Sequence, residues 1–444
     1  MKGSPMLCTR SRMGPALAAA SVIAVVAGGN SAVVASPRGA GIERVSVSTG
    51  GGQADGDSAF QAISANGRFV AFDSFGSNLV PQDTNGALDV FVRDRRAGTT
   101  ERVSVSGTGQ QGGGDSYGPA ISADGRYVAF GSFADLVPGD INGIPDIFVR
   151  DRLAGTTTQV SVSSSEVPAD YESRFPAISA DGRYITFSSS AGNLVRGDTN
   201  EAMDVFVRDR LAGTTTRVSV SSTGGQADGI SDDAAISANG RFVTFATDAA
   251  NLVRGDTNDN TDVLVRDRLA GTTTRVSVSS SGGQANAYNV DPVISADGRY
   301  IAFESYAANL AGGDTNDTPD IYVHDRWARS TTRVSVSSTG EQPDRFAGGA
   351  SISANGRWVL FYSDASNLTP AGGDGLAGAF VRDRLAGTTT RVTPLNPGWE
   401  SETESIYLAK ISADGRSIVF TTAAANLVPD DTNDRYDVFA RDIG

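Results

Sequence analysis

The stretch Ile178-Ser179-Ala180-Asp181-Gly182-Arg183-Tyr184-Ile185-Thr186-Phe187 decides the fold, because variants of it occur seven times along the chain. The first residue of this stretch recurs every 57 to 59 residues, with equivalents at Ile63, Ile121, Ile236, Ile294, Ile352 and Ile411. A fixed period of this length indicates an array of similar supersecondary units, so the architecture follows from the repeat before any local assignment.

Each repeat divides into four strand-like segments. In the third repeat these segments are residues 176–179, 183–188, 204–209 and 216–221. An Asp-Gly or Asn-Gly pair separates the first two segments in every repeat, and such pairs favour tight hairpin turns because both central positions need a positive φ. No stretch of useful length has a helical period, so the sequence predicts an all-β chain.

Seven units of four antiparallel strands are typical of a seven-bladed β-propeller. The seventh repeat lacks its fourth strand, whereas residues 42–48 form a strand-like segment that has no blade. We expect this N-terminal strand to pair in the last blade, because the pairing closes the ring and protects both free strand edges. The propeller then spans residues 42–444, and residues 36–41 form a linker.

The first 35 residues differ in character from the rest of the chain. A basic start is followed by an apolar run over residues 16–27 and by small residues up to Ala35. This pattern is typical of a secretory signal peptide, and the run is short for a membrane span. We expect a secreted, periplasmic or cell-envelope protein whose mature chain has no transmembrane segment. An uncleaved N-terminal anchor is the alternative.

Composition narrows the partners of the protein. The net charge of −14 repels phosphate backbones, so we expect no nucleic-acid partner. Cys8 is the only cysteine and lies in the predicted signal segment, so the mature chain has no disulfide. Lysine is almost absent, occurring only as Lys2 and Lys410. We expect a monomer.

The repeats resemble the WD40-like propeller repeat of the TolB type, also called PD40. The residues that carry the resemblance are Ser122–Arg126 in the turn, Tyr127–Phe130 in the second strand and Asp146–Asp151 in the third. The resemblance covers residues 42–444 and implies a propeller fold. The α/β domain of TolB and the hydrolase domain of the prolyl-peptidase relatives have no counterpart in this sequence, so we expect a free-standing propeller.

Six repeats carry the motif Asp-x-Asn-x-x-x-Asp between the second and third strands. Oxygen ligands at alternate positions of a turn are typical of the start of a calcium loop. The candidate calcium ligands are Asp83, Asn85, Asp89, Asp140, Asn142, Asp146, Asp198, Asn200, Asp204, Asp256, Asn258, Asp262, Asp314, Asn316, Asp320, Asp431, Asn433 and Asp437. The alternative is structural, because Asp and Asn side chains also bond their own backbone in Asx-turns.

The loops before the first strands keep a nearly constant length while their sequence changes, which is typical of a binding face. Candidate ligand-contacting residues on this loop face are Gln53, Gln226, Gln284, Gln342 and Trp399.

Signatures of catalysis are weak. The only histidine, His324, stands where other repeats have Arg, and no Ser–His–Asp or Cys–His pattern is present. We therefore expect a non-enzymatic binding or scaffold protein that recognises a protein or glycan through the loop face, with no catalytic residues and no certain cofactor. The alternatives are an extracellular polysaccharide hydrolase or lyase and a calcium-stabilised structural module. Acidic residues from non-equivalent positions at the propeller axis would favour the enzyme.

Overall fold

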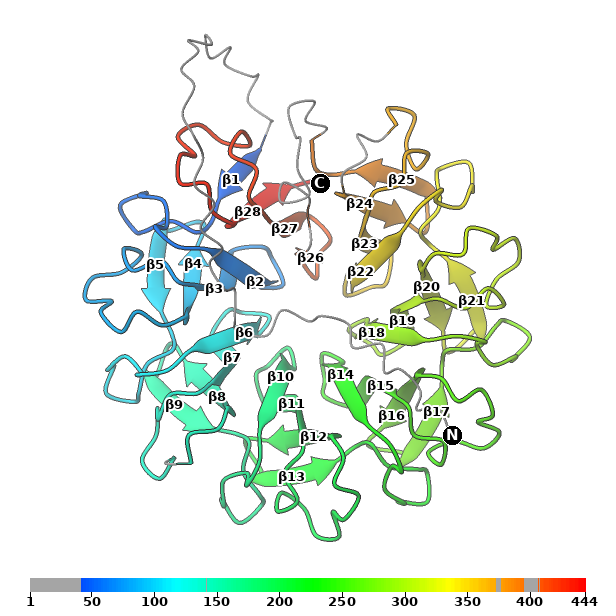
Figure 1. The fold of residues 1–444 in the computed structure, drawn as a ribbon, viewed down its shortest axis with the longest axis horizontal. Coiled ribbons are helices and arrows are strands. Elements are labelled where there is room, and N and C mark those ends of the chain that lie inside the picture. The colour runs from blue at the N-terminus through cyan, green and yellow to red at the C-terminus, as the bar shows by residue number, and fades with distance from the viewer. Residues whose placement is uncertain (1–40, 141, 373–376, 395–405, 407) are drawn as a thin grey trace, which may run out of the picture. The chain divides into compact units, whose positions relative to one another are not determined.

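The computed structural model describes residues 41–140, 142–372, 377–394, 406 and 408–444 (Figure 1). The predicted signal segment and Trp399 lie outside these residues. Arg38–Gly444 form one compact unit, and its described part contains only β-strands and their connections. Within this part, no helix has the length and apolar character needed to cross a membrane.

Twenty-eight strands form seven four-stranded antiparallel sheets, the blades, around a common axis (Figure 1). Blade 1 contains β2 (Ser58–Ile63), β3 (Phe69–Ser74), β4 (Asp89–Asp94) and β5 (Thr99–Arg102), and blade 2 contains β6 (Ser116–Ile121), β7 (Tyr127–Ser132), β8 (Asp146–Asp151) and β9 (Thr156–Gln159). Blade 3 contains β10 (Ser173–Ile178), β11 (Tyr184–Ser189), β12 (Asp204–Asp209) and β13 (Thr214–Arg217), and blade 4 contains β14 (Ser231–Ile236), β15 (Phe242–Thr247), β16 (Asp262–Asp267) and β17 (Thr272–Arg275). Blade 5 contains β18 (Asn289–Ile294), β19 (Tyr300–Ser305), β20 (Asp320–Asp325) and β21 (Ser330–Arg333), and blade 6 contains β22 (Ala347–Ile352), β23 (Trp358–Ser363), β24 (Gly378–Asp383) and β25 (Thr388–Arg391). Blade 7 contains β26 (Leu408–Ile411), β27 (Ser417–Thr422), β28 (Asp437–Asp442) and β1 (Ile42–Arg44).

The hydrophobic core lies between neighbouring blades. The first strand of each blade is innermost, and these seven inner strands contact one another around the axis. Each buried cluster joins two blades, as where Ile147 and Val149 of blade 2 pack with Ile185 and Phe187 of blade 3. This arrangement explains why the second and third strands are apolar on both faces.

The predicted closure of the ring is confirmed. Strand β1 pairs antiparallel with β28, with Ile42 opposite Arg441 and Arg44 opposite Phe439. Val45 N then donates to Val438 O over 2.7 Å. Blade 7 is therefore built from both ends of the described chain.

A belt of backbone hydrogen bonds also joins all seven blades at the turns after the inner strands. Ala65 N donates to Ala123 O (3.0 Å), and the same contact continues around the ring. The last step closes the belt, because Asp414 N of blade 7 donates to Ala65 O of blade 1 (3.1 Å).

The predicted fourth strand is partly wrong. Residues 216–221 were expected to be extended, but β13 ends at Arg217. Ser219 is fully buried, and its hydroxyl donates to Asp204 and accepts from Val205 N (3.1 Å). This side chain replaces a backbone partner at the strand end, so the alternating Val and Ser residues do not mark an outer strand with one wet face.

The first strands are longer than predicted, because β10 begins at Ser173 rather than Pro176. A bulge between Arg174 and Ala177 shifts the register and hides the alternation. The bulge recurs in blades 1 to 6 with one residue at positive φ. These residues are Phe60, Gly118, Phe175, Asp233, Asp291 and Gly349.

Removal of the closing strand tests the role of ring closure. We compare chains that begin at Gly41 and at Thr49. The shorter chain loses the β1–β28 pairing and buried Val45, so we expect its Tm to fall by roughly 5–10 °C. Equal Tm values for the two chains would contradict closure by β1.

Candidate functional site

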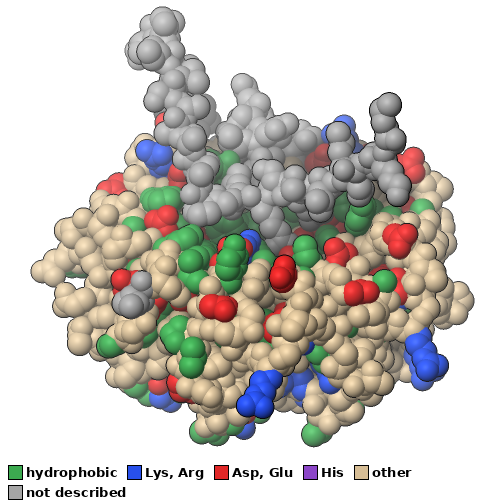
Figure 2. All heavy atoms as spheres, turned by 60° about the horizontal axis from the view of Figure 1, so that its bottom comes forward, with side chains coloured by type: hydrophobic (Ala, Val, Ile, Leu, Met, Phe, Trp, Pro, Cys, Tyr) green, Lys and Arg blue, Asp and Glu red, His purple; other side chains and the backbone are tan. Residues whose placement is uncertain are grey.

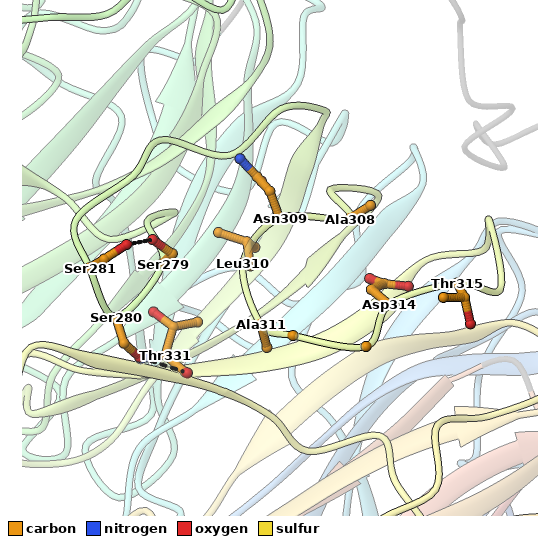
Figure 3. A pocket seen from close by; sticks show the side chains of 12 residues that line it. Ser279, Ser280, Ser281, Ala308, Asn309, Leu310, Ala311, Asp314, Thr315 and Thr331 are labelled. Carbon is orange, nitrogen blue, oxygen red and sulfur yellow. Dashed lines mark hydrogen bonds between the residues drawn. The ribbon is translucent and has the colours of Figure 1, made fainter.

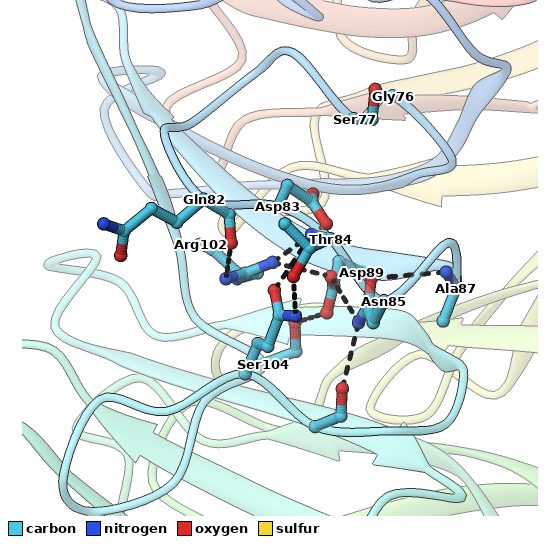
Figure 4. Close-up of polar contacts among 12 residues, drawn as sticks. Gly76, Ser77, Gln82, Asp83, Thr84, Asn85, Ala87, Asp89, Arg102 and Ser104 are labelled. Atoms are coloured by element: carbon cyan, nitrogen blue, oxygen red, sulfur yellow. Dashed lines mark hydrogen bonds and ion pairs between the residues drawn. The ribbon is translucent and has the colours of Figure 1, made fainter.

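An arginine, not an open loop, organises the Asp-x-Asn-x-x-x-Asp motif. In blade 1 the Arg102 guanidinium lies 3.1 Å from both Asp83 Oδ1 and Asp89 Oδ2 (Figure 4). Ser104 Oγ donates to Asp89 Oδ1 over 2.5 Å, and Asn85 Nδ2 donates to Asp89 Oδ2 over 3.1 Å. We call this arrangement, two buried carboxylates around one guanidinium, the arginine clasp.

The arginine clasp recurs in four further blades. The Arg–Asp distances for the first and second Asp are 2.9 and 3.0 Å at Arg217, 3.4 and 3.1 Å at Arg275, 3.6 and 2.9 Å at Arg333, and 3.7 and 3.6 Å at Arg44. In blade 6 a glycine, Gly378, replaces the second Asp, and a side chain there would collide with Arg391. Blade 2 has Gln159 in place of the arginine.

The geometry of the arginine clasp bears on the predicted calcium sites. In five blades the guanidinium supplies the positive charge between the two carboxylates, where a metal ion would otherwise sit. The Asn side chains serve as Asx-turn acceptors, as where Ala87 N donates to Asn85 Oδ1 (3.3 Å). These five motifs therefore fit a structural role better than a calcium ion, and bound calcium stays a prediction.

The predicted glutamines on the loop face belong to the same network. Gln226 accepts from Arg217 (3.0 Å) and donates to Thr199 (3.1 Å). Gln342 likewise accepts from Arg333 (2.7 Å). Gln53 donates to Thr432 (3.0 Å) and Gln284 donates to Asp256 (3.1 Å). The structure thus brings these four residues into the clasps of their own blades, and Gln111, which the sequence analysis omitted, makes the equivalent bond to Thr84.

The loop face also carries an open hollow of about 650 Å³ at blade 5 (Figure 3). Its lining includes Ser279–Ser281, Ala308–Thr315 and Thr331, and Asp314 is the only charged residue among them. On the face that Figure 2 shows, acidic and hydrophobic side chains are interspersed without a large patch of one kind.

The inner strands differ, because they carry charged residues that the repeat does not predict. Arg174 lies on β10, Asp232 and Asp233 on β14, Asp291 on β18 and Lys410 on β26. We call these five residues the axial cluster. Positions equivalent to Lys410 hold Ala, Val or Ser in the other blades. The five charges thus occupy three positions of the inner strand: Arg174 is equivalent to Asp232 and Asp233 to Asp291, whereas Lys410 stands alone.

Lys410 and Asp291 interact across two non-adjacent blades. The protein surroundings desolvate the Lys410 ammonium and lower its pKa, whereas the Asp291 carboxylate opposes the shift and raises it. Lys410 nevertheless keeps solvent-exposed surface. A partly accessible lysine with a lowered pKa is the kind of group that can act as a general base.

Arg174 adds a cation to the same set of strands. It pairs with Glu172, and its guanidinium lies 5.8 Å from the Phe175 ring centroid. The Arg174 Nε atom has no hydrogen-bond partner in the described part of the protein.

Two acidic side chains on second strands accept hydrogen bonds from the inner strand of the next blade. Asp73 on β3 accepts a hydrogen bond from Gly118 N (3.0 Å), and the equivalent Glu304 on β19 accepts one from Gly349 N (3.3 Å). Both glycines sit at the positive-φ position of the bulge in the next blade. Burial raises the pKa of Asp73 well above the usual aspartate range. These acids hold the bulges in place.

The single histidine, His324, takes the place of the arginine that other blades have at this position. His324 is buried, its Nδ1 lies 2.9 Å from Thr331 Oγ1, and burial lowers its pKa to about 4. Arginines at the equivalent positions bond the same threonine in other blades, as Arg93 bonds Thr100 (3.1 Å).

No protein-family model matches the sequence, and no curated protein matches it. Solved structures do match its fold. Two oligogalacturonate lyases, one from Vibrio parahaemolyticus and one in complex with manganese, give TM-scores of 0.55 and 0.54 at 10% and 12% identity. These matches cover 91% and 92% of this chain and 93% and 95% of the lyases.

Other similar structures are peptidases and TolB proteins. A prolyl endopeptidase gives a TM-score of 0.50 at 11% identity, over 87% of this chain and 50% of that one. TolB from Acinetobacter baumannii gives 0.40 at 15% identity, over 75% of this chain and 62% of that one. The TolB-type resemblance is confirmed for the fold, since the structure has the propeller blades that the resemblance implied.

The prediction of a non-enzymatic binding or scaffold protein is contradicted. Solved propellers that share this fold over almost the whole chain are lyases, and the propeller of a prolyl endopeptidase shares it as well. The similar folds are thus mixed in function, and the absence of a Ser–His–Asp pattern was too narrow a test for catalysis.

The manganese in one of these lyases raises the question of a metal centre here. Among residues that the structure describes, no group of three or more His, Cys, Asp and Glu side chains is placed to hold a metal ion. His324 is bonded to Thr331. The residues do not fit a manganese centre of that kind, and we assign no catalytic step to a metal.

The arginine clasp can be tested by replacing its cation. Arg102→Met leaves Asp83 and Asp89 buried without a counter-charge, so we expect the free energy of unfolding to fall by about 3–5 kcal/mol. The control is Arg68→Met, which breaks a pair between a partly exposed guanidinium and Asp94. Asp94 keeps hydrogen bonds from Arg96 N and Ala97 N, so this variant should lose less stability than Arg102→Met. Chemical denaturation measures both, and equal losses would contradict the clasp.

Proposed function

We propose that the chain is a lyase that cleaves uronic-acid oligosaccharides by β-elimination, with the axial cluster as its active site. The observation that carries the proposal is Lys410, the only lysine after Lys2. It lies on the inner strand β26, where desolvation lowers its pKa and Asp291 opposes that shift. The whole-length fold similarity to oligogalacturonate lyases supports the choice of reaction.

β-Elimination needs a base and a group that neutralises the uronate carboxylate. Neutral Lys410 would remove the proton from carbon 5 of the sugar, and the bond from carbon 4 to the glycosidic oxygen would break. A double bond then forms between carbons 4 and 5, and protonated Lys410 can return its proton to the leaving oxygen. The step uses no water and no oxidant.

Arg174 is our candidate for binding the uronate carboxylate. A guanidinium matches a carboxylate in shape and charge, and it stabilises the negative charge that builds up when carbon 5 loses its proton. Asp232 and Asp233 can accept hydrogen bonds from sugar hydroxyl groups. Such a substrate occurs outside the cytoplasm, so the predicted signal peptide and export to the periplasm, cell envelope or medium form part of this proposal.

Lys410 variants test the reaction. We expect full-length protein to release unsaturated uronides from oligogalacturonate, detected by their ultraviolet absorbance. Lys410→Arg keeps the charge but removes the base, so we expect kcat to fall by about 100-fold or more. Ala120→Ser, at the equivalent position on β6, is the control that should keep activity. Full activity of Lys410→Arg, or no unsaturated product from any uronide tested, would overturn the proposal.

The pH profile gives a second test of the base. Lys410 acts when neutral, so kcat should rise with pH through the lysine pKa. Asp291 raises that pKa, so Asp291→Asn should move the rise to lower pH. An unchanged pH profile of kcat in Asp291→Asn would show that Asp291 does not act on the pKa of the catalytic base.

A further inference from the structure

Blade 2 departs from the other blades at the arginine clasp. Asp140 and Asp146 keep the two carboxylate positions and are buried, at 4% and 0% exposure. Gln159 replaces the arginine, and Pro168 stands where neighbouring blades have the glutamine that ties the clasp. Blade 2 therefore has both carboxylates of the clasp but lacks the arginine and the glutamine that bonds to the clasp in the neighbouring blades.

The acids of blade 2 are left incompletely satisfied. Ser161 Oγ donates to Asp146 Oδ1 (2.5 Å), as in the other clasps. The Gln159 and Asn142 amides interact with the Asp146 carboxylate and oppose the rise in its pKa, but neither makes a hydrogen bond of normal length to Asp146 Oδ2 in the described structure. Gln159 Nε2 likewise has no hydrogen-bond partner there. Burial, with the charges of Asp146 and Asp135, raises the pKa of Asp140 to about 6. A buried carboxylate oxygen without a partner is unfavourable unless a cation or proton joins it.

We propose that blade 2 binds a hard divalent cation such as Ca²⁺ at the position that the guanidinium occupies in blades 1, 3, 4, 5 and 7. The five arginine clasps indicate that this pocket between two carboxylates is built for positive charge. The ligands would be the carboxylates of Asp140 and Asp146 and the side-chain carbonyl of Gln159, all oxygen atoms of the kind that Ca²⁺ prefers. Two carboxylates give a weak site, with a Kd on the order of 0.1–1 mM.

The site differs from the predicted set of six calcium motifs, because it is single. The competing explanation is a proton held between Asp140 and Asp146, which needs no metal. Because protons compete with a metal ion for carboxylate oxygens, binding should weaken as the pH falls. Tyr117 and Asp146 both belong to blade 2, so this ring is the candidate to sensitise a bound lanthanide.

Terbium luminescence, competed by Ca²⁺ on the full chain at pH 7.5, tests the site. We expect one Tb³⁺ per chain, displaced by millimolar Ca²⁺, with weaker binding at pH 5. Gln159→Arg restores an arginine clasp and should abolish the signal. Arg217→Gln, the reciprocal change in blade 3, should create a second site.

Three outcomes would overturn the proposal. They are no terbium binding by the natural sequence, unchanged binding by Gln159→Arg, and six sites per chain. The Gln159→Arg variant adds a cation to a buried acidic pair, so it should fold, and its Tm should exceed that of the natural chain without metal. Thermal melting with and without Ca²⁺ gives an independent readout, with a rise of about 1–2 °C expected only where the site is intact.

Discussion

The pairing of β1 with β28 is the constraint on which the rest of the structure depends. A propeller blade buries its two faces only if it has neighbours on both sides, so an open array would leave two apolar sheet faces in water. Here the first strand of the described chain completes the last blade. The belt of backbone hydrogen bonds from Ala65 to Asp414 closes at the same place. Closure thus fixes the position of every inner strand.

The repeats use one set of contacts to hold each blade to the next. Aromatic residues of the second strands lie between two guanidiniums, as Tyr127 does between Arg126 (4.8 Å) and Arg210 of the next blade (4.6 Å). Buried serines bond the first residue of the third strand, and arginine clasps neutralise the acids beside them. Because these tasks recur in equal form, the residues that perform them repeat along the sequence.

Departures from the repeat are therefore the places where function can be sought. Lys410 and Arg174 have no counterpart of the same charge at the equivalent described positions of the other blades, whereas Asp291 shares its bulge position with Asp233 of blade 4. All of these residues lie on inner strands. Gln159 departs from the repeat in a different way, because it removes a charge that the fold otherwise supplies. The predicted binding function rested on residues of the loop face, whereas the proposed lyase chemistry rests on charged residues of the inner strands.

The sequence by itself determined the blade count, the turns and the closing strand, because period, Asp-Gly pairs and alternation are local signals. It did not show that Ser219 is buried. Alternating Val and Ser residues are expected both for an outer strand whose serines face solvent and for a segment whose serines make buried side-chain hydrogen bonds. The sequence also showed that Lys410 is the only lysine after Lys2, but it did not show which residues surround Lys410. Only the tertiary structure shows that Asp291 of blade 5 acts on the pKa of Lys410 of blade 7 and that an arginine lies between the Asp pairs. Those contacts join residues distant in sequence, and they exist only once the ring has closed.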